Sequence, residues 1–339
     1  LNLYWSIPNM LIVEITLAIF GLILLSAGGY VLVAGGAALA KKLQISSMVV
    51  GLTVVAYGTS TPELAASLTA VFNSHTDLIL GNIVGSNISN IGMVIGISAM
   101  IATGLVIDGK KRNGLGMRRR VVTRWLPIMI FVSFLMLLLS FDGEISQIDG
   151  AILVAGLIVF TIYIVKSAKK QIPVGDVIED EDPSGDMAIS RFKVNTTPRA
   201  IFAVVVGAVL LFIGGDLTVD GAVNVAEDLG ISELVIGVVI VAIGTSLPEL
   251  ITSVIAIRKK QMDIGIGNIV GSNIYNILLI GGISATLIGI PVSTDVFSNY
   301  YIMIAFSLVL FIGFRKFIPR FVGIGLAMAF VAYLVSLLV

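Results

Sequence analysis

A gapless internal repeat of very apolar sequence limits the fold of this chain more than any other feature. Residues 48–101 align with residues 234–287 at a constant offset of 186, and 27 of the 54 aligned positions are identical. The whole chain has a mean hydropathy of +1.05 and only 12% charged residues, which is about half the charged fraction of a soluble domain. The repeat therefore belongs to a membrane protein in which one structural unit occurs twice.

Ten apolar stretches are long enough to cross a bilayer, which takes about 20 predominantly apolar residues in a helix. They cover residues 11–39, 46–72, 78–106, 122–140, 148–165, 200–226, 232–257, 264–287, 296–314 and 321–339. The repeat divides them into two five-helix sets, residues 1–167 and residues 199–339. Because five is odd, the two copies cross the membrane in opposite directions. The predicted fold is thus an all-α polytopic membrane protein with two inverted five-helix repeats, which is typical of transporters that work by alternating access.

The positive charges predict the orientation, because Lys and Arg in short loops are retained on the cytoplasmic side. All 21 Lys and Arg residues lie in or at the edge of the loops that follow the first, third, fifth, seventh and ninth stretches. These loops are predicted to be cytoplasmic and both termini extracellular. The fifth loop, residues 168–198, is acidic around residues 175–187, and we interpret it as a solvated linker. The segment lacks the glycine and ligand spacing of an EF-hand, which disfavours a cation-sensing role.

Two polar motifs lie within these apolar stretches, once in each copy. The first is Gly-Thr-Ser-x-Pro-Glu at 58–63 and 244–249; the second is Gly-Asn-Ile-Val-Gly-Ser-Asn at 81–87 and 267–273, followed by Asn90 and Asn276. Proline removes a backbone donor and clashes with the preceding turn, so each first motif is expected to break its helix. Glu63 and Glu249 each cost about 2.5–3.5 kcal/mol at a helix centre. Because no Lys or Arg lies deep in any stretch, their partner must be a cation or protons.

Composition narrows the chemistry of such a site. The chain has no Cys and a single His, His75, so thiolate and imidazole metal centres are excluded and oxygen ligands remain, which Ca²⁺ and Na⁺ prefer. No base for a serine hydrolase occurs within the stretches, and a net charge of zero leaves no basic face for nucleic acid. No cofactor is expected: the ions would be substrates, and the lipid bilayer the surrounding partner. No oligomeric state is predicted.

With these motifs, the chain resembles the cation/calcium antiporter superfamily and, within it, the prokaryotic sodium/calcium exchangers. The resemblance covers nearly the whole chain. It implies a multi-pass protein of the cell membrane, not an enzyme, that exchanges Na⁺ for Ca²⁺ at an all-oxygen site at the bilayer midplane. It also implies that the first and sixth helices slide against a core of helices 2, 3, 7 and 8.

The resemblance also implies a set of ion ligands. Those taken as direct metal ligands are Glu63, Glu249, Thr59 and Thr245. The others are Ser60, Ser246, Ser86, Asn90, Ser272 and Asn276, with the backbone carbonyls of Ala56 and Ala242. Some relatives have Asp at the position of Asn276, so this site has two formal negative charges rather than three.

Other interpretations stay open from the residues alone. A proton-coupled Ca²⁺ antiporter would use Glu63 and Glu249 as proton carriers, whereas a passive channel fits inverted repeats less well. Interhelical hydrogen bonding is the structural alternative for Ser86, Asn90, Ser272 and Asn276. Four further asparagines are expected to cap freed backbone groups, namely Asn82, Asn87, Asn268 and Asn273. Asp216 and Asp220 have no acidic match in the first copy and are expected on a solvated helix face.

Overall fold

The computed structural model describes residues 3–73, 76–103, 105–107, 110–168, 196–229 and 242–338. This part is mostly helical. Seven of its helices are long and apolar enough to cross a membrane, namely Ile12–Leu43, Leu78–Ile101, Val121–Leu139, Gln147–Ala168, Thr197–Asp228, Met262–Ile288 and Val296–Arg315. Ser47–Thr59 and Arg320–Ser336 are shorter apolar helices. His75 and the acidic segment 175–187 lie outside the described residues.

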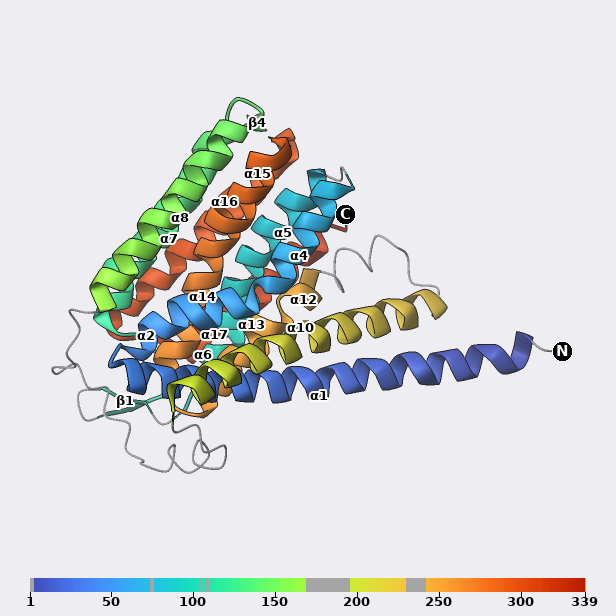
Figure 1. The fold of residues 1–339 in the computed structure, drawn as a ribbon, viewed down its shortest axis with the longest axis horizontal. Coiled ribbons are helices and arrows are strands. Elements are labelled where there is room, and N and C mark those ends of the chain that lie inside the picture. Colours follow the sequence, from blue (N-terminus) through green and yellow to red (C-terminus); the bar gives the residue numbers. More distant parts are fainter. Residues whose placement is uncertain are drawn as a thin grey trace.

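Each predicted stretch contains helix in the part that the structure describes (Figure 1). The first five stretches contain α1 (Leu3–Leu43); α2 (Ser47–Val50), η1 (Gly51–Val55), α3 (Ala56–Thr59) and α4 (Thr61–Phe72); α5 (Thr76–Ser89), η2 (Asn90–Ile95) and α6 (Gly96–Ile101); η3 (Val121–Trp125) and α7 (Leu126–Leu139); and α8 (Gln147–Ala168). The last five contain α10 (Thr197–Asp228); α12 (Ala242–Thr245) and α13 (Leu247–Arg258); α14 (Met262–Tyr275), η5 (Asn276–Gly281) and α15 (Gly282–Ile288); α16 (Thr294–Val309) and η6 (Leu310–Arg315); and α17 (Arg320–Ser336).

The prediction of a purely helical chain missed three short strand pairs. They are β1 (Leu105–Ile107) with β2 (Lys110–Arg112), β3 (Gly114–Gly116) with β6 (Phe317–Pro319), and β4 (Glu144–Ile145) with β5 (Ile290–Pro291), all antiparallel. The third stretch was predicted to continue to residue 106, but its helix ends at Ile101 because Ala102 has an extended backbone (φ −65°, ψ 126°). Strands of two or three residues are too short to show a period-two pattern in the sequence.

The strand pairs show which loops meet. β3 in the third loop pairs with β6 in the ninth, whereas β4 in the fourth loop pairs with β5 in the eighth. Arg118 of the third loop also reaches the start of α14, after the seventh loop, where its Nε lies 3.1 Å from Asp263 Oδ2. Odd loops therefore meet odd loops and even loops meet even loops, and Figure 1 shows β1 and β4 at opposite ends of the molecule. Helices that alternate in direction have this arrangement.

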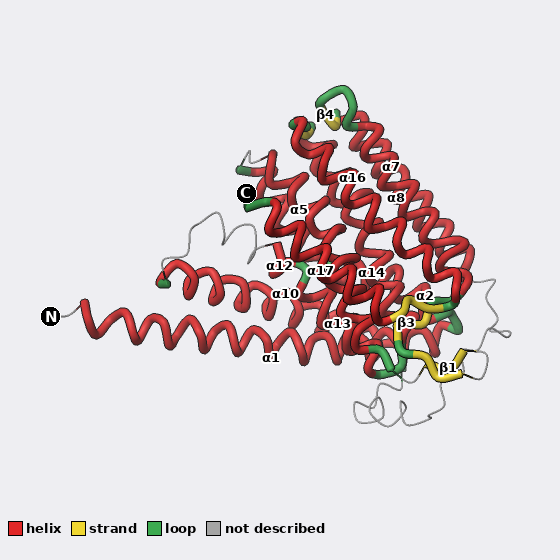
Figure 2. Tube along the Cα trace, turned by 180° about the vertical axis from the view of Figure 1, so that it is seen from behind, coloured by secondary structure: helices red, strands yellow, loops and turns green. Residues whose placement is uncertain are grey.

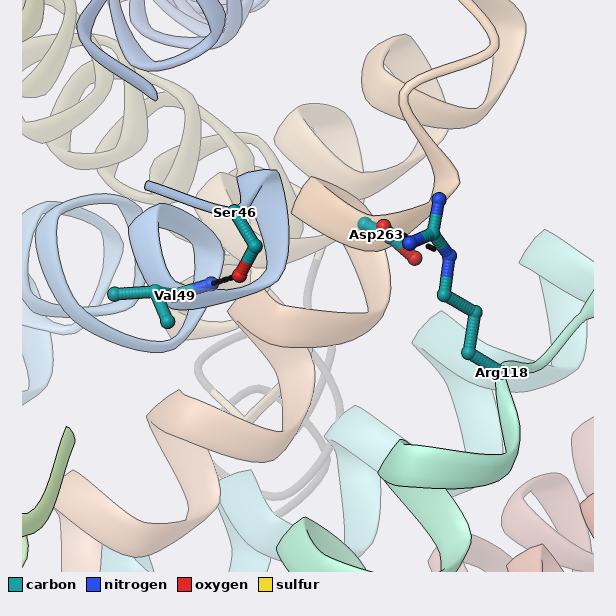
Figure 3. Close-up of polar contacts among 4 residues, drawn as sticks. All are labelled: Ser46, Val49, Arg118 and Asp263. Atoms are coloured by element: carbon teal, nitrogen blue, oxygen red, sulfur yellow. Dashed lines mark hydrogen bonds and ion pairs between the residues drawn. The ribbon is translucent and has the colours of Figure 1, made fainter. Parts of the chain in front are cut away.

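Local polar contacts fix the starts of two helical segments at the end of the molecule where odd loops meet (Figure 3). Ser46 is the N-cap of α2, and its Oγ accepts a hydrogen bond from Val49 N at 3.3 Å. Asp263 lies in the first turn of α14, where a negative charge is favoured by the helix dipole. The Arg118 side chain is 45% exposed, so the ion pair contributes at most about 1 kcal/mol to stability.

α1 and α10 form a separate pair along one edge of the molecule, and the N-terminal end of α1 projects beyond the other helices (Figures 1 and 2). Their contact uses glycines seven residues apart, which are Gly21, Gly28 and Gly35 on α1 and Gly207, Gly214 and Gly221 on α10. A Cβ atom built on Gly28 would lie 2.8 Å from the backbone nitrogen of Leu211, and one on Gly214 would lie 2.6 Å from that of Leu25. Only glycine permits the two backbones to approach this closely.

The two candidate spans that carry the second polar motif are the most deeply buried of the seven. The most apolar window of Met262–Ile288 is 94% buried and that of Leu78–Ile101 is 78% buried, whereas the other five candidate spans reach at most 50%. α14 packs against α2, η1 and α3, and a Cβ on Gly267 would lie 2.8 Å from the carbonyl oxygen of Met48 in α2. The second motif therefore lies at the centre of the bundle, next to the helix that contains the first.

Candidate ion-binding site

The predicted helix breaks are present in both copies at equivalent positions. α3 ends at Thr59 and α4 begins at Thr61, with Ser60 between them at φ −85° and ψ 9°. α12 and α13 are separated in the same way by Ser246, at φ −90° and ψ 3°. The proline that follows each serine lies in the first turn of the new helix. Backbone N–H groups there have no acceptor within the helix, so the missing N–H of proline costs no hydrogen bond.

Each break places a glutamate in the first turn of the new helix, Glu63 in α4 and Glu249 in α13. Unpaired N–H groups at a helix start favour negative charge there. Both side chains are nevertheless almost completely buried, with 1% and 0% exposure. Neither carboxylate forms an ion pair within the described part of the chain. Each copy therefore holds an acidic group in the interior, and the described residues provide no basic partner for it.

Hydroxyl groups from both copies surround Glu249. Its Oε1 accepts hydrogen bonds from Ser60 Oγ at 3.2 Å and from Ser272 Oγ at 3.3 Å, and its Oε2 has no partner. Ser60 comes from the break of the first copy and Ser272 from the second motif of the second copy. Since Ser60 of one break bonds to Glu249 of the other, the two breaks meet at one place.

The surroundings of Glu63 differ, although the local sequence is nearly the same. Neither of its carboxylate oxygens has a hydrogen-bond partner in the described structure. Ser246 Oγ, the counterpart of Ser60, is buried without a partner, and Ser86 Oγ, the counterpart of Ser272, donates to Asn82 Oδ1 at 3.4 Å. The site is thus asymmetric, with both oxygens of Glu63 available to a ligand.

The two threonines of the first motif also differ between the copies. Thr59 is buried and donates to Asn268 Oδ1 at 2.9 Å, with Ser272 Oγ 3.4 Å away. Thr245 is half-buried, and none of the described hydrogen bonds involves its side chain. The carbonyl oxygen of Ala56 accepts the Ser60 N–H at 3.0 Å, so it remains engaged in the helix; Ala242 is the first residue of α12.

Asn90 and Asn276 each begin a π-helical segment, η2 and η5. The amide nitrogen of Asn90 donates to Asn273 Oδ1 at 3.0 Å, and that of Asn276 donates to Asn87 Oδ1 at 3.1 Å. The Oδ1 atoms of Asn90 and Asn276 are buried and have no hydrogen-bond partner among the described residues. The sequence did not predict these π segments, which often occur at functional sites, because a single wide turn leaves the apolar character of a buried helix unchanged.

The asparagines for which a structural role was expected all bond to protein groups. Asn82 Nδ2 donates to the Glu63 carbonyl oxygen at 2.9 Å and to Ser67 Oγ at 2.8 Å. Asn268 Nδ2 donates to Ser253 Oγ at 3.2 Å, which is the same contact in the second copy. Asp216 and Asp220 are exposed on α10, apart from this hydrogen-bonded cluster.

The described hydrogen bonds leave an excess of acceptors at this place. Five buried oxygens that can only accept hydrogen bonds have no donor among the described residues, and they lie on four of the predicted ligands: Glu63 Oε1 and Oε2, Glu249 Oε2, Asn90 Oδ1 and Asn276 Oδ1. A buried acceptor without a partner is costly, and either a hard cation or protons would satisfy such a set. Among the described residues, no three His, Cys, Asp or Glu side chains lie close enough together to hold a metal ion. Further ligands for a metal ion there would be neutral oxygens, which suit Na⁺ and Ca²⁺.

The difference between the two threonines gives a stability prediction. Thr59→Val removes the donor to Asn268 Oδ1 and leaves that buried acceptor unpaired, so we expect a loss of about 1–3 kcal/mol in the free energy of unfolding. Thr245→Val is the matched control and should change it by less than about 0.5 kcal/mol. Thermal unfolding of the purified protein in detergent without Ca²⁺ would measure both. Equal losses in the two variants would contradict the asymmetry described here.

Comparison with known proteins identifies the family of the chain. The family model described as "Sodium/calcium exchanger protein" matches residues 13–166 and 199–339. The chain is 33% identical over 334 residues to the putative antiporter CaxA of Alkalimonas amylolytica, covering 95% of this chain and 98% of that protein. It is also 33% identical over 369 residues to the sodium/calcium exchanger MaX1 of Methanosarcina acetivorans, covering 97% of this chain and 99% of that protein.

A solved structure shows the same fold. The sodium-calcium exchanger NCX_Mj, soaked with 2.5 mM Na⁺ and 10 mM Sr²⁺, superimposes with a TM-score of 0.77 at 29% identity, covering 96% of this chain and 99% of that one. The predictions of a multi-pass protein of a prokaryotic cell membrane and of an antiporter family, not an enzyme family, are confirmed. The chain belongs to the sodium/calcium exchanger family.

Proposed function

We propose that this protein is a secondary active antiporter that exchanges Na⁺ for Ca²⁺ across the cell membrane by alternating access. The observation that carries the proposal is a set of five buried acceptor oxygens that have no donor among the described residues. They belong to four residues, and all four lie beside the helix breaks or at the start of the π segments, which repeat at an offset of 186. MaX1 and NCX_Mj, which cover nearly the whole chain, are both named sodium/calcium exchangers, and this supports the choice of ions.

The proposed architecture has ten membrane-spanning helices in two inverted halves, residues 1–167 and 199–339, joined by the cytoplasmic linker 168–198. Both termini would be extracellular. The contacts of odd loops with odd loops and of even loops with even loops support an alternating arrangement. The charge distribution supports the orientation, because Lys and Arg concentrate in the odd loops.

In the proposed site, Glu63 and Glu249 provide the charge at the midplane. Thr59 and Thr245 would be the other direct metal ligands, with the remaining hydroxyls, amides and carbonyls of the predicted set around them. Two carboxylates about 5 Å apart repel by about 3 kcal/mol at an effective dielectric constant of 20. One Ca²⁺ or two monovalent ions would reverse this repulsion, so the two kinds of ion compete for the same pocket.

The partnerless oxygens of Glu63 also favour a second candidate, exchange of H⁺ for Ca²⁺. A proton on a buried carboxyl group removes the cost of its charge, as a metal ion would. In this case Glu63 and Glu249 would carry protons across the membrane in place of Na⁺.

Flux into liposomes that contain the purified full-length protein would separate the two functions. We expect uptake of radioactive Ca²⁺ when Na⁺ is present only inside, and no uptake when choline replaces Na⁺ at equal pH on both sides. Uptake driven by a pH gradient without Na⁺ would favour proton coupling. Unitary currents in planar bilayers would indicate a channel and contradict both.

A further inference from the structure

The two ligand asparagines are each tied to an asparagine of the other repeat copy. Asn90 Nδ2 donates to Asn273 Oδ1 at 3.0 Å, and Asn276 Nδ2 donates to Asn87 Oδ1 at 3.1 Å. The offset of 186 converts one bond into the other, so the same contact is made twice. All four side chains are at most 1% exposed. We refer to Asn87, Asn90, Asn273 and Asn276 as the asparagine clasp.

Further contacts fix the orientation of the supporting amides, those of Asn87 and Asn273. Asn87 Nδ2 donates to the carbonyl oxygen of Asn273 at 3.2 Å and lies 3.6 Å from Met303 Sδ. Asn273 Nδ2 lies 3.5 Å from Met129 Sδ. A thioether sulfur and a carbonyl oxygen can only accept hydrogen bonds, so the amide nitrogens of Asn87 and Asn273 face them. Their Oδ1 atoms must then face the ligand asparagines.

The clasp in turn fixes the orientation of the ligand amides. If the Asn276 amide turned by half a rotation, its Oδ1 would meet Asn87 Oδ1, and two buried acceptors would be in contact without a donor. The observed orientation instead leaves the Oδ1 atoms of Asn90 and Asn276 without a partner. Each lies one helical turn beyond the serine of its motif, Ser86 or Ser272, and Ser272 contacts Glu249.

We propose that Asn87 and Asn273 are positioning residues, which hold the amides of Asn276 and Asn90 with their oxygens toward the transported ion. This inference rests on the proposed function, because it takes Asn90 and Asn276 as ion ligands. It also gives a reason for the neutral residue at position 276. An ionised Asp there would offer only acceptors to Asn87 Oδ1, so the clasp favours an amide and keeps the formal charge of the site at two.

A double-mutant cycle on Ca²⁺ binding to the purified full-length protein tests this role, with Ca²⁺ alone as the ligand. We expect Asn87→Leu to raise the dissociation constant about tenfold, because Asn276 loses the bond that orients it. In the background of Asn276→Ala there is no amide to orient, so Asn87→Leu should then raise the dissociation constant less than about twofold.

The matched control cycle combines Asn87→Leu with Asn90→Ala. Asn90 lies on the same helix face as Asn87 but bonds to Asn273 and not to Asn87. The factors by which Asn87→Leu and Asn90→Ala each raise the dissociation constant should therefore multiply in the double variant. Thermal unfolding without Ca²⁺ would check that each variant folds. If Asn87→Leu does not fold, the equivalent cycle of Asn273→Leu with Asn90→Ala replaces the first.

The outcomes separate this inference from the proposed function. Suppose that wild type binds Ca²⁺, and that Asn87→Leu raises the dissociation constant by the same factor in the Asn276→Ala background as in the Asn90→Ala background. The positioning role is then rejected and the proposed function remains. If wild type binds no Ca²⁺, the proposed function fails and the inference fails with it.

Discussion

Glu249→Gln and Glu63→Gln should each lower Ca²⁺ uptake into liposomes by at least about 100-fold, equivalent to a loss of about 3 kcal/mol in ion binding. Each variant loses one of the two charges of a buried site, and the remaining carboxylate faces a divalent ion without help from a second charge. Glutamine has nearly the same shape as glutamate, so packing in the first turns of α4 and α13 is preserved. Initial rates of radioactive Ca²⁺ uptake with Na⁺ inside would measure the loss.

The same two variants should be more stable than wild type when no ion is bound. Two buried carboxylates without basic partners repel each other and are poorly solvated, and an uncharged amide removes both costs. We expect an ion-free unfolding temperature above that of wild type, and no further increase when Ca²⁺ is added. Glu144→Gln is the matched control, because Glu144 is exposed in the short strand β4 between α7 and α8 and its change should affect neither property. Normal uptake in either buried variant would remove that carboxylate from the mechanism.

Gly214→Leu should destabilise the protein by about 3 kcal/mol or more, because it overpacks the contact between α1 and α10. Even the first side-chain atom would lie 2.6 Å from the backbone nitrogen of Leu25 and 2.8 Å from the carbonyl oxygen of Gly21. Neither backbone atom can move without separating the helices. The yield of folded protein and its unfolding temperature in detergent would both decrease, and transport would decrease with them.

A glycine in α17 provides the control for this prediction. A Cβ on Gly325 would meet no atom within 4 Å, so Gly325→Leu should be tolerated. Gly214→Ala should have an intermediate effect, whereas Gly325→Ala should be neutral or stabilising, because alanine favours helix by about 1 kcal/mol over glycine. Equal effects at positions 214 and 325 would show that close backbone contact does not hold α1 and α10 together.

Much of the fold could be predicted because its causes are local in the sequence. Long apolar runs predict the helices: α10 extends two or three residues beyond its predicted ends, whereas α1 begins at Leu3, eight residues before its predicted start, and ends four residues after its predicted end. Pro62 and Pro248 predict the breaks, since a missing N–H acts at its own position whatever surrounds it. The strand pairs could not be predicted, because Gly114–Gly116 is defined by its contact with Phe317–Pro319, about two hundred residues away in the chain.

The polar site was predicted as a set of residues but not as an arrangement. The first motifs of the two copies differ at one position, Thr61 against Leu247, yet Ser60 bonds to Glu249 while Ser246 has no partner. Two nearly identical local sequences cannot themselves encode this difference, so it arises from the tertiary surroundings. Likewise, the clasp pairs Asn90 with Asn273 across 183 residues, and the sequence shows the pairing only as a repeated motif.

Equilibrium binding of radioactive Ca²⁺ to the purified protein, titrated with Na⁺ at constant ionic strength and pH, tests the central claim most directly. We expect one Ca²⁺ per chain, displaced by Na⁺ but not by choline, and no binding to the double variant Glu63→Gln/Glu249→Gln. Calcium binding that persists in the double variant, or that Na⁺ does not displace, would contradict the claim that one pair of buried carboxylates takes both ions in turn.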